Sequence, residues 1–134
     1  FATAMALYWA ASARLCSGHT SAATALMKDL ITITDEHQIR YLRSCGRIVE
    51  GQIELLSGQI EQGQQRINQA LGEFATQGAG LGLPWVLILP IDACIRSGQL
   101  AQARGMLEKV AAAAGRNGEQ QWQAEVLRLS GELL

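Results

Sequence analysis

The sequence lacks a charge excess of either sign, a paired-cysteine motif and a long apolar run. Eleven Lys and Arg against twelve Asp and Glu leave a net charge of -1. Phosphate contacts need a clustered excess of Lys and Arg, so we expect no direct nucleic-acid partner. With 134 residues, 49% of them hydrophobic, the chain is of a size that buries roughly 70% of its unfolded surface and needs no disulfide or metal for stability.

Cysteine usage and the apolar segments point to the cytoplasm. The thiols Cys16, Cys45 and Cys94 are odd in number and have no CxxC spacing, as is typical of reduced cysteines in a cytosolic protein. The longest apolar run, residues 81–95, is too short for a membrane span and contains two prolines and an aspartate. The apolar N-terminal residues 1–13 lack the positive charge of a signal peptide.

The pair Ser-Gly recurs at residues 17–18, 57–58 and 97–98, at intervals of 40 residues. Repetition at such a period is typical of stacked-repeat proteins. After the second and third of these glycines, apolar or small residues occupy the same offsets in steps of three or four, which keep them on one helix face. The weaker copy after the first glycine has threonines at its ends.

These patterns predict an all-α fold, because no strand pattern competes anywhere in the chain. Gly18 is expected to end the first helix in the left-handed conformation, and Pro84 suits the first turn of the fifth. Residues 115–118 are expected to break the chain before the last helix. Seven helices are expected, at about residues 3–17, 20–35, 39–57, 60–77, 84–97, 100–114 and 119–134.

A small residue, a glycine seven positions later and Ala or Gly five further on is a spacing that resembles the tetratricopeptide repeat. In that geometry the first and third positions face each other where two helices cross. In the third repeat the first position is occupied by Ile91 instead of a small residue. The structural repeat positions are Ala11, Gly18, Ala23, Gly51, Gly58, Gly63, Gly98, Ala103 and Gly131.

This resemblance implies a right-handed α-α superhelix of about three and a half helix pairs with a 40-residue period. A single domain over residues 1–134 would hold repeat units at about 3–38, 39–82 and 83–118 and a partial unit at 119–134. The usual period is 34 residues, and the Trp and Tyr anchors of the family are missing here. HEAT and armadillo repeats fit the period better, but they do not share this glycine spacing.

Segments 6–10, 78–85, 96–99 and 118–134 are similar to the C-terminal repeat region of large bacterial signalling ATPases. In that family the repeats follow a nucleotide-binding ATPase module, and the effector is often an adenylate cyclase or a winged-helix DNA-binding domain. The resemblance implies that the chain is a fragment whose repeats sense a ligand or partner and restrain the ATPase. Because a repeat array needs polar end caps, we also expect self-association through exposed ends.

Three local motifs have a chemical interpretation, and each has a simpler structural one. Gly58–Gly63 has the glycine spacing of a P-loop but lacks the following Lys and Ser or Thr, so we assign it to repeat packing. Gly78–Gly82 follows no strand and is interpreted as a loop between repeats. Asp35–His37 could offer metal ligands but fits a solvated turn. We therefore expect no cofactor, no metal and no enzymatic activity.

Tetratricopeptide geometry would place a binding surface on the concave face, lined by the first helix of each pair. Aromatic and polar groups there suit a peptide, a small ligand or the ATPase module of the parent chain. The alternative is that some of them fill the core. The candidates are Tyr8, Ser12, Gln52, Trp85, Asp92, Arg96 and Arg128. A sensing module of a regulatory ATPase is the leading function, and a stand-alone adaptor is the alternative.

Overall fold

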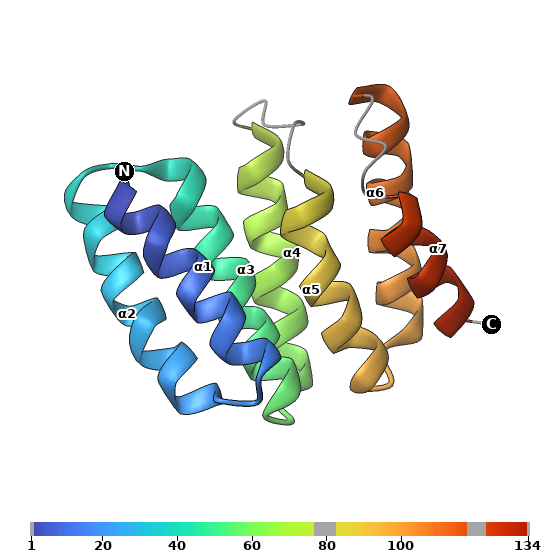
Figure 1. The fold of residues 1–134 in the computed structure, drawn as a ribbon, viewed down its shortest axis with the longest axis horizontal. Coiled ribbons are helices and arrows are strands. Elements are labelled where there is room, and N and C mark those ends of the chain that lie inside the picture. The colour runs from blue at the N-terminus through green and yellow to red at the C-terminus, as the bar shows by residue number, and fades with distance from the viewer. Residues whose placement is uncertain (1, 77–82, 118–122, 134) are drawn as a thin grey trace. The chain divides into compact units, whose positions relative to one another are not determined.

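The computed structural model describes residues 2–76, 83–117 and 123–133, and these residues form seven α-helices and no strand (Figure 1). The predicted all-α class is therefore confirmed. The helices are α1 (Ala2–Cys16), α2 (Thr20–Glu36), α3 (Arg40–Leu56), α4 (Ile60–Thr76), α5 (Leu83–Arg96), α6 (Leu100–Asn117) and α7 (Gln123–Glu132).

The first five helices begin and end within one residue of the expected positions, and Pro84 lies in the first turn of α5 as predicted. The break expected over residues 115–118 is wrong at its beginning, because α6 continues to Asn117. One glycine costs a helix only about 1 kcal/mol, which is too little to end it. The expected start of the last helix near residue 119 and the loop at 78–82 lie outside the described residues.

Three helices end in the same way, at intervals of 40 residues. The glycines that follow them have positive φ angles: 80° at Gly18, 87° at Gly58 and 78° at Gly98. After Gly18, the His19 N–H donates to the Arg14 carbonyl oxygen at 2.8 Å, and the corresponding bonds after the other two glycines measure 2.9 and 2.8 Å. This is the Schellman arrangement, in which a left-handed residue lets the chain turn back on the last helical carbonyls.

The end of α2 uses the same arrangement without a glycine. Gln38 has φ 54°, and the following Ile39 N–H donates to the Thr34 carbonyl oxygen at 2.9 Å. A left-handed conformation costs a residue with a Cβ about 1 to 2 kcal/mol. The α2–α3 connection is therefore held in a strained conformation that the Gly18, Gly58 and Gly98 turns avoid.

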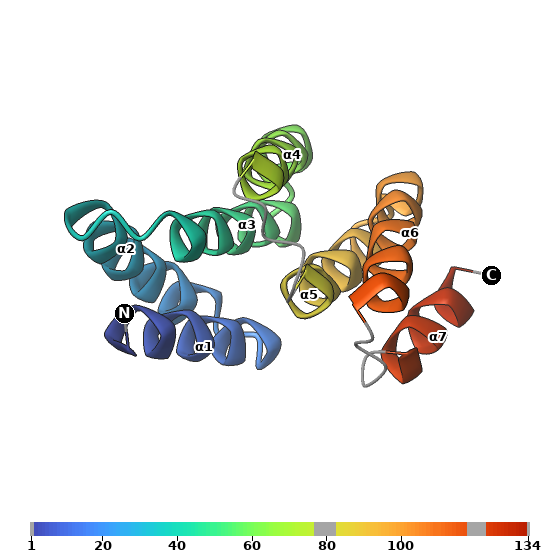
Figure 2. The same ribbon diagram turned by 90° about the horizontal axis from the view of Figure 1, so that it is seen from above.

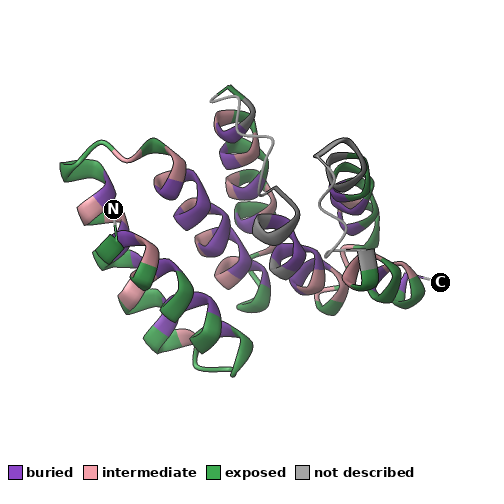
Figure 3. Cartoon of the chain, turned by 45° about the horizontal axis from the view of Figure 1, so that its top comes forward, coloured by how far each residue is buried: buried purple, intermediate pink, exposed green. Residues whose placement is uncertain are grey.

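The chain divides into two compact units, Phe1–Gln77 and Gly78–Leu134. In the first unit, α3 contacts α1, α2 and α4 (Figure 2). Nine of the 17 residues of α3 are buried, as Figure 3 shows by colour. The core of this unit includes Tyr8, Ala11, Ala23, Met27, Leu30, Leu42, Ile48, Leu55, Ile67 and Phe74.

The α3 and α4 helices cross where both carry glycine. A Cβ atom built on Gly63 would lie 2.7 Å from the Gly51 carbonyl oxygen and 2.9 Å from the Leu55 Cγ. A Cβ atom on Gly51 would lie 2.6 Å from the Ile67 Cγ1. The backbones are too close for any side chain at either position, so the close approach expected between Gly51 and Gly63 is present.

In the second unit, α5, α6 and α7 all contact one another. Their buried residues include Leu87, Ile91 and Cys94 of α5, Ala103 and Val110 of α6, and Leu129 of α7. None of the helices in the described ranges combines the length and apolar character that a membrane crossing requires.

Candidate functional site

The candidate binding residues fall into two groups that differ in exposure. Tyr8, Ser12 and Gln52 are buried, with exposed fractions of 2%, 4% and 4%. In the second unit, Asp92 is partly exposed and Arg96 is exposed. Arg128 is also exposed, and Trp85 lies in α5, but its side chain is outside the described part of the chain.

Tyr8 of α1 is buried in the core of the first unit, close enough to Cys45 of α3 to interact with it electrostatically. Burial raises the pKa of its phenol well above the ordinary value, and the charges of Cys45 and Tyr41 raise it further. Ser12 lies near enough to the phenol to lower this pKa in part, although its own Oγ atom has no hydrogen bond of normal geometry. The position of Tyr8 therefore fits the alternative that some of the candidate residues fill the core.

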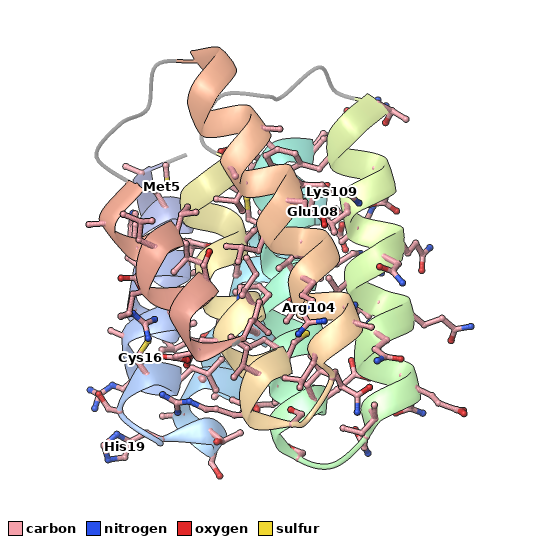
Figure 4. The ribbon with its side chains drawn as sticks, turned by 90° about the vertical axis from the view of Figure 1, so that its right-hand side faces the viewer. Met5, Cys16, His19, Arg104, Glu108 and Lys109 are labelled. Carbon is pink, nitrogen blue, oxygen red and sulfur yellow. The ribbon has the colours of Figure 1, made fainter. Side chains whose placement is uncertain are left out.

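The buried thiols are poor nucleophiles. Burial raises the pKa of Cys45 to about 12 and that of Cys94 to about 11. Only the thiolate form attacks a substrate or binds a metal, so both side chains act as small apolar groups at neutral pH. Cys16 is exposed at the end of α1, near His19 at the following turn (Figure 4).

The exposed candidates of the second unit form a charged cluster on α5 and α7. Arg96 Nε lies 2.9 Å from the Asp92 carboxylate. Arg128 donates from Nε to Glu125 at 2.9 Å and also pairs with Glu132. The Asp92 charge is one of those that raise the pKa of Arg128, after the larger effect of Glu125. Each arginine is thus ion-paired, and the cluster has three acids and two cations.

A polar cavity of about 300 Å³ lies where α2 meets α3, beside Asp35, and a second of about 280 Å³ adjoins it on the α4 side. Both are lined by Arg40 and Arg43. The Arg43 Nε atom lies 2.7 Å from the Asp35 carboxylate, and Glu73 lines the second cavity together with both arginines. The acids balance the two cations, so the pair of cavities has no net attraction for an anion. The two arginines were not among the candidates expected from the sequence, although their spacing of three residues at the start of α3 places them on one face of the helix.

A more apolar groove of about 360 Å³ lies between α6 and α7. Arg104 of α6 donates from Nη2 to the Leu133 carbonyl oxygen at 3.0 Å, which caps the end of α7 (Figure 4). The groove was not expected from the sequence, because it depends on the angle and register at which two consecutive helices pack. Its lining residues are Arg104, Leu107, Glu108, Ala111, Val126, Ser130 and Leu133.

A network of charges links α3 to α4. Arg66 Nη1 lies 3.1 Å from the Glu50 carboxylate, and its Nε atom pairs with Glu54. Burial raises the pKa of Glu50, and the charge of Arg66 opposes that effect. This network holds the two helices at their crossing, and nothing in its geometry leaves a cation free to bind a ligand.

Two of the three local sequence motifs, Gly58–Gly63 and Asp35–His37, lie within the described residues. Gly58 turns the chain into α4, and Gly63 lies against the Gly51 carbonyl oxygen, so Gly63 allows the close packing of α4 against α3. His37, next to the acidic pair at the end of α2, is exposed. Among the described residues, no three His, Cys, Asp or Glu side chains gather in a way that could hold a metal ion.

The chain has no significant match among protein-family models, curated proteins or solved structures.

Proposed function

We propose that the chain is a tetratricopeptide-like repeat module, non-catalytic and cytoplasmic, that binds a protein or peptide as the sensing region of a bacterial regulatory ATPase. The partner can be a separate protein or the ATPase module of the parent chain. The fold in this proposal is a right-handed superhelix of about three and a half helix pairs with a 40-residue period.

The main support for the proposal is that the same type of helix C-terminus recurs at the ends of α1, α3 and α5. Gly18, Gly58 and Gly98 have nearly the same φ angle and the same hydrogen bond across the turn. Five residues after each glycine stands a buried small residue, namely Ala23, Gly63 or Ala103. The same local geometry at a fixed interval is what stacked repeats require.

The α3–α4 crossing supports the register of these repeats. Gly51 and Gly63 face each other within contact distance, and their positions are the first and third of one repeat. In the neighbouring pairs, the corresponding residues are also inaccessible to solvent. These are Ala11 and Ala23 in the first pair and Ile91 and Ala103 in the third.

The solvent exposure of the candidate residues limits which of them can contact a partner. Tyr8, Ser12 and Gln52 are buried within the first unit, so in this conformation they are not accessible to a partner. Asp92, Arg96 and Arg128 are accessible to different degrees, and we place partner contact there. Such a surface of paired charges suits a polar peptide segment with both acidic and basic side chains.

The test starts with the reading frame upstream of Phe1. If it encodes a P-loop ATPase, the ATPase rate of the parent protein is measured with Arg96→Glu and Arg128→Glu combined. Loss of restraint predicts a higher rate, whereas Lys109→Glu, an exposed charge change on α6, should leave the rate unchanged (Figure 4). Equal rates in all three proteins would refute the restraining role. A start codon just before Phe1 would favour the adaptor alternative.

A further inference from the structure

The polar cavity between the start of α3 and the end of α4 has a volume of about 280 Å³. This volume lies just below the range of about 300 to 1,000 Å³ that is typical of pockets for drug-sized ligands. The described residues that line the cavity all have polar side chains, so the cavity suits a small polar molecule. They are Arg40, Arg43, Ser44, Glu73 and Thr76.

Two opposite charges in this cavity have no partner among the described residues. Neither the Arg40 guanidinium nor the Glu73 carboxylate takes part in an ion pair or a side-chain hydrogen bond with them. Arg43, in contrast, is paired with Asp35. Arg40 and Glu73 therefore line one cavity without pairing with each other, and a ligand that carries both charges can pair with both residues.

The cavity lies between two helices that cover each other. The beginning of α3 and the end of α4 lie at the same end of this antiparallel pair (Figure 1). The two helices are in extensive contact, and α3 also contacts α2. All three helices belong to the first unit. The cavity is thus a feature of the packed interior of that unit and not of an uncovered helix face.

We propose that this cavity binds a free α-amino acid with a small polar side chain. The carboxylate of the ligand pairs with Arg40, whose planar guanidinium can donate two parallel hydrogen bonds to it. The ammonium group of the ligand pairs with Glu73. A simple anion is not favoured, because Asp35 and Glu73 balance the charges of Arg40 and Arg43 in the two adjoining cavities.

This site goes beyond the proposed function, since it would take a small molecule and not a protein or peptide. It also lies in the first unit, whereas the partner surface was placed on α5 and α7 of the second. The inference uses neither the repeat register nor that surface. The two proposals can therefore fail separately.

Thermal unfolding in the presence of amino acids tests for binding. The standard L-amino acids are added singly at about 10 mM, which nearly saturates a site with a dissociation constant of about 1 mM. A ligand that binds only the folded chain raises the thermal midpoint, so we expect the largest rise among serine, threonine, asparagine and glutamine. If none of the amino acids raises the midpoint, Arg40 and Glu73 do not form an amino-acid site and the proposal is wrong.

Paired changes in the protein and the ligand test the two contacts by calorimetry. Arg40→Gln and Glu73→Gln should each raise the dissociation constant of the best amino acid at least about tenfold, because each removes a charge-assisted hydrogen bond. Replacing the ligand carboxylate by a carboxamide should weaken binding to the wild type but not weaken it further in Arg40→Gln. Removing the ligand ammonium group should behave likewise with Glu73→Gln. Losses that do not follow this pairing would overturn the assigned contacts.

Two charge changes outside the cavity serve as matched controls. Arg14→Gln on α1 and Glu61→Gln at the opposite end of α4 both alter exposed side chains and should leave the dissociation constant unchanged. An equal loss in these controls would contradict a site at Arg40 and Glu73. Absence of amino-acid binding, while the charge variants of α5 and α7 still change the ATPase rate, would refute this site and leave the proposed function intact.

Discussion

The α3 and α7 helices have corresponding positions 80 residues apart, but their surroundings differ. Gly51 of α3 touches the backbone of α4, whereas Gly131 of α7 has open space where a side chain would begin. On α3 the buried Cys45 corresponds to Glu125 of α7, which is only partly buried. The small residue at this position permits a crossing, but a second helix must be present for the crossing to form.

The largest effect is expected at the covered crossing. Gly63→Leu should lower the free energy of unfolding by about 3 kcal/mol, the upper end of the usual cost of overpacking, because the new side chain meets the backbone of α3. Urea unfolding of the wild type and the variant measures the change.

Two glycines provide controls for this substitution. Gly72 lies on the exposed side of the same helix, and neither it nor Gly131 has a neighbour in the direction of a Cβ atom. Gly72→Leu and Gly131→Leu should leave the protein as stable as the wild type or stabilise it by up to about 1 kcal/mol, since leucine favours helix more than glycine does. A loss at Gly131 as large as that at Gly63 would mean that α7 is covered in the same way as α3.

The second prediction uses the buried thiol of α3. Burial raises the pKa of Cys45 from 9.0 to about 12, so from pH 9 upwards the unfolded chain loses this proton before the folded chain does. The folded state then binds more protons, and stability falls as the pH rises. The stability advantage of the wild type over Cys45→Ala should therefore shrink between about pH 9 and about pH 12.

Urea unfolding of both proteins across this pH range measures the difference. A constant gap would show that Cys45 ionises equally easily in the folded and unfolded chains. Glu125→Gln on α7 is the comparison, because it changes a side chain at the corresponding, only partly buried position and should not alter the alkaline dependence.

The smallest effect concerns the helix ends. Gln38 has a positive φ angle without being glycine, so Gln38→Gly should stabilise the protein by about 0.5 to 1 kcal/mol. The relief of left-handed strain exceeds the extra entropy that glycine loses on folding. The thermal midpoint should rise. Gln38→Ala keeps the strain and serves as the control, and an equal rise in both variants would contradict this explanation.

The candidate site was predictable only in part. The sequence placed the candidates on the first helices of the pairs, but it could not assign exposure to each one. Arg96 and Arg128 are exposed, and each pairs with acids of its own helix, Asp92 on α5 and Glu125 and Glu132 on α7. The groove between α6 and α7 was not predicted, because its lining residues alternate with others along both helices and only their contact brings them together.

By itself, the sequence determined the all-α class and nearly all of the helix ends, because a helix end depends on hydrogen bonds that span five residues or fewer. Gly18, Gly58 and Gly98 specify such turns locally. Tertiary structure alone decided that Tyr8 and Gln52 are buried while Leu127 is open. The exposure of a side chain depends on which other helix lies against it, and that contact joins residues far apart in the chain.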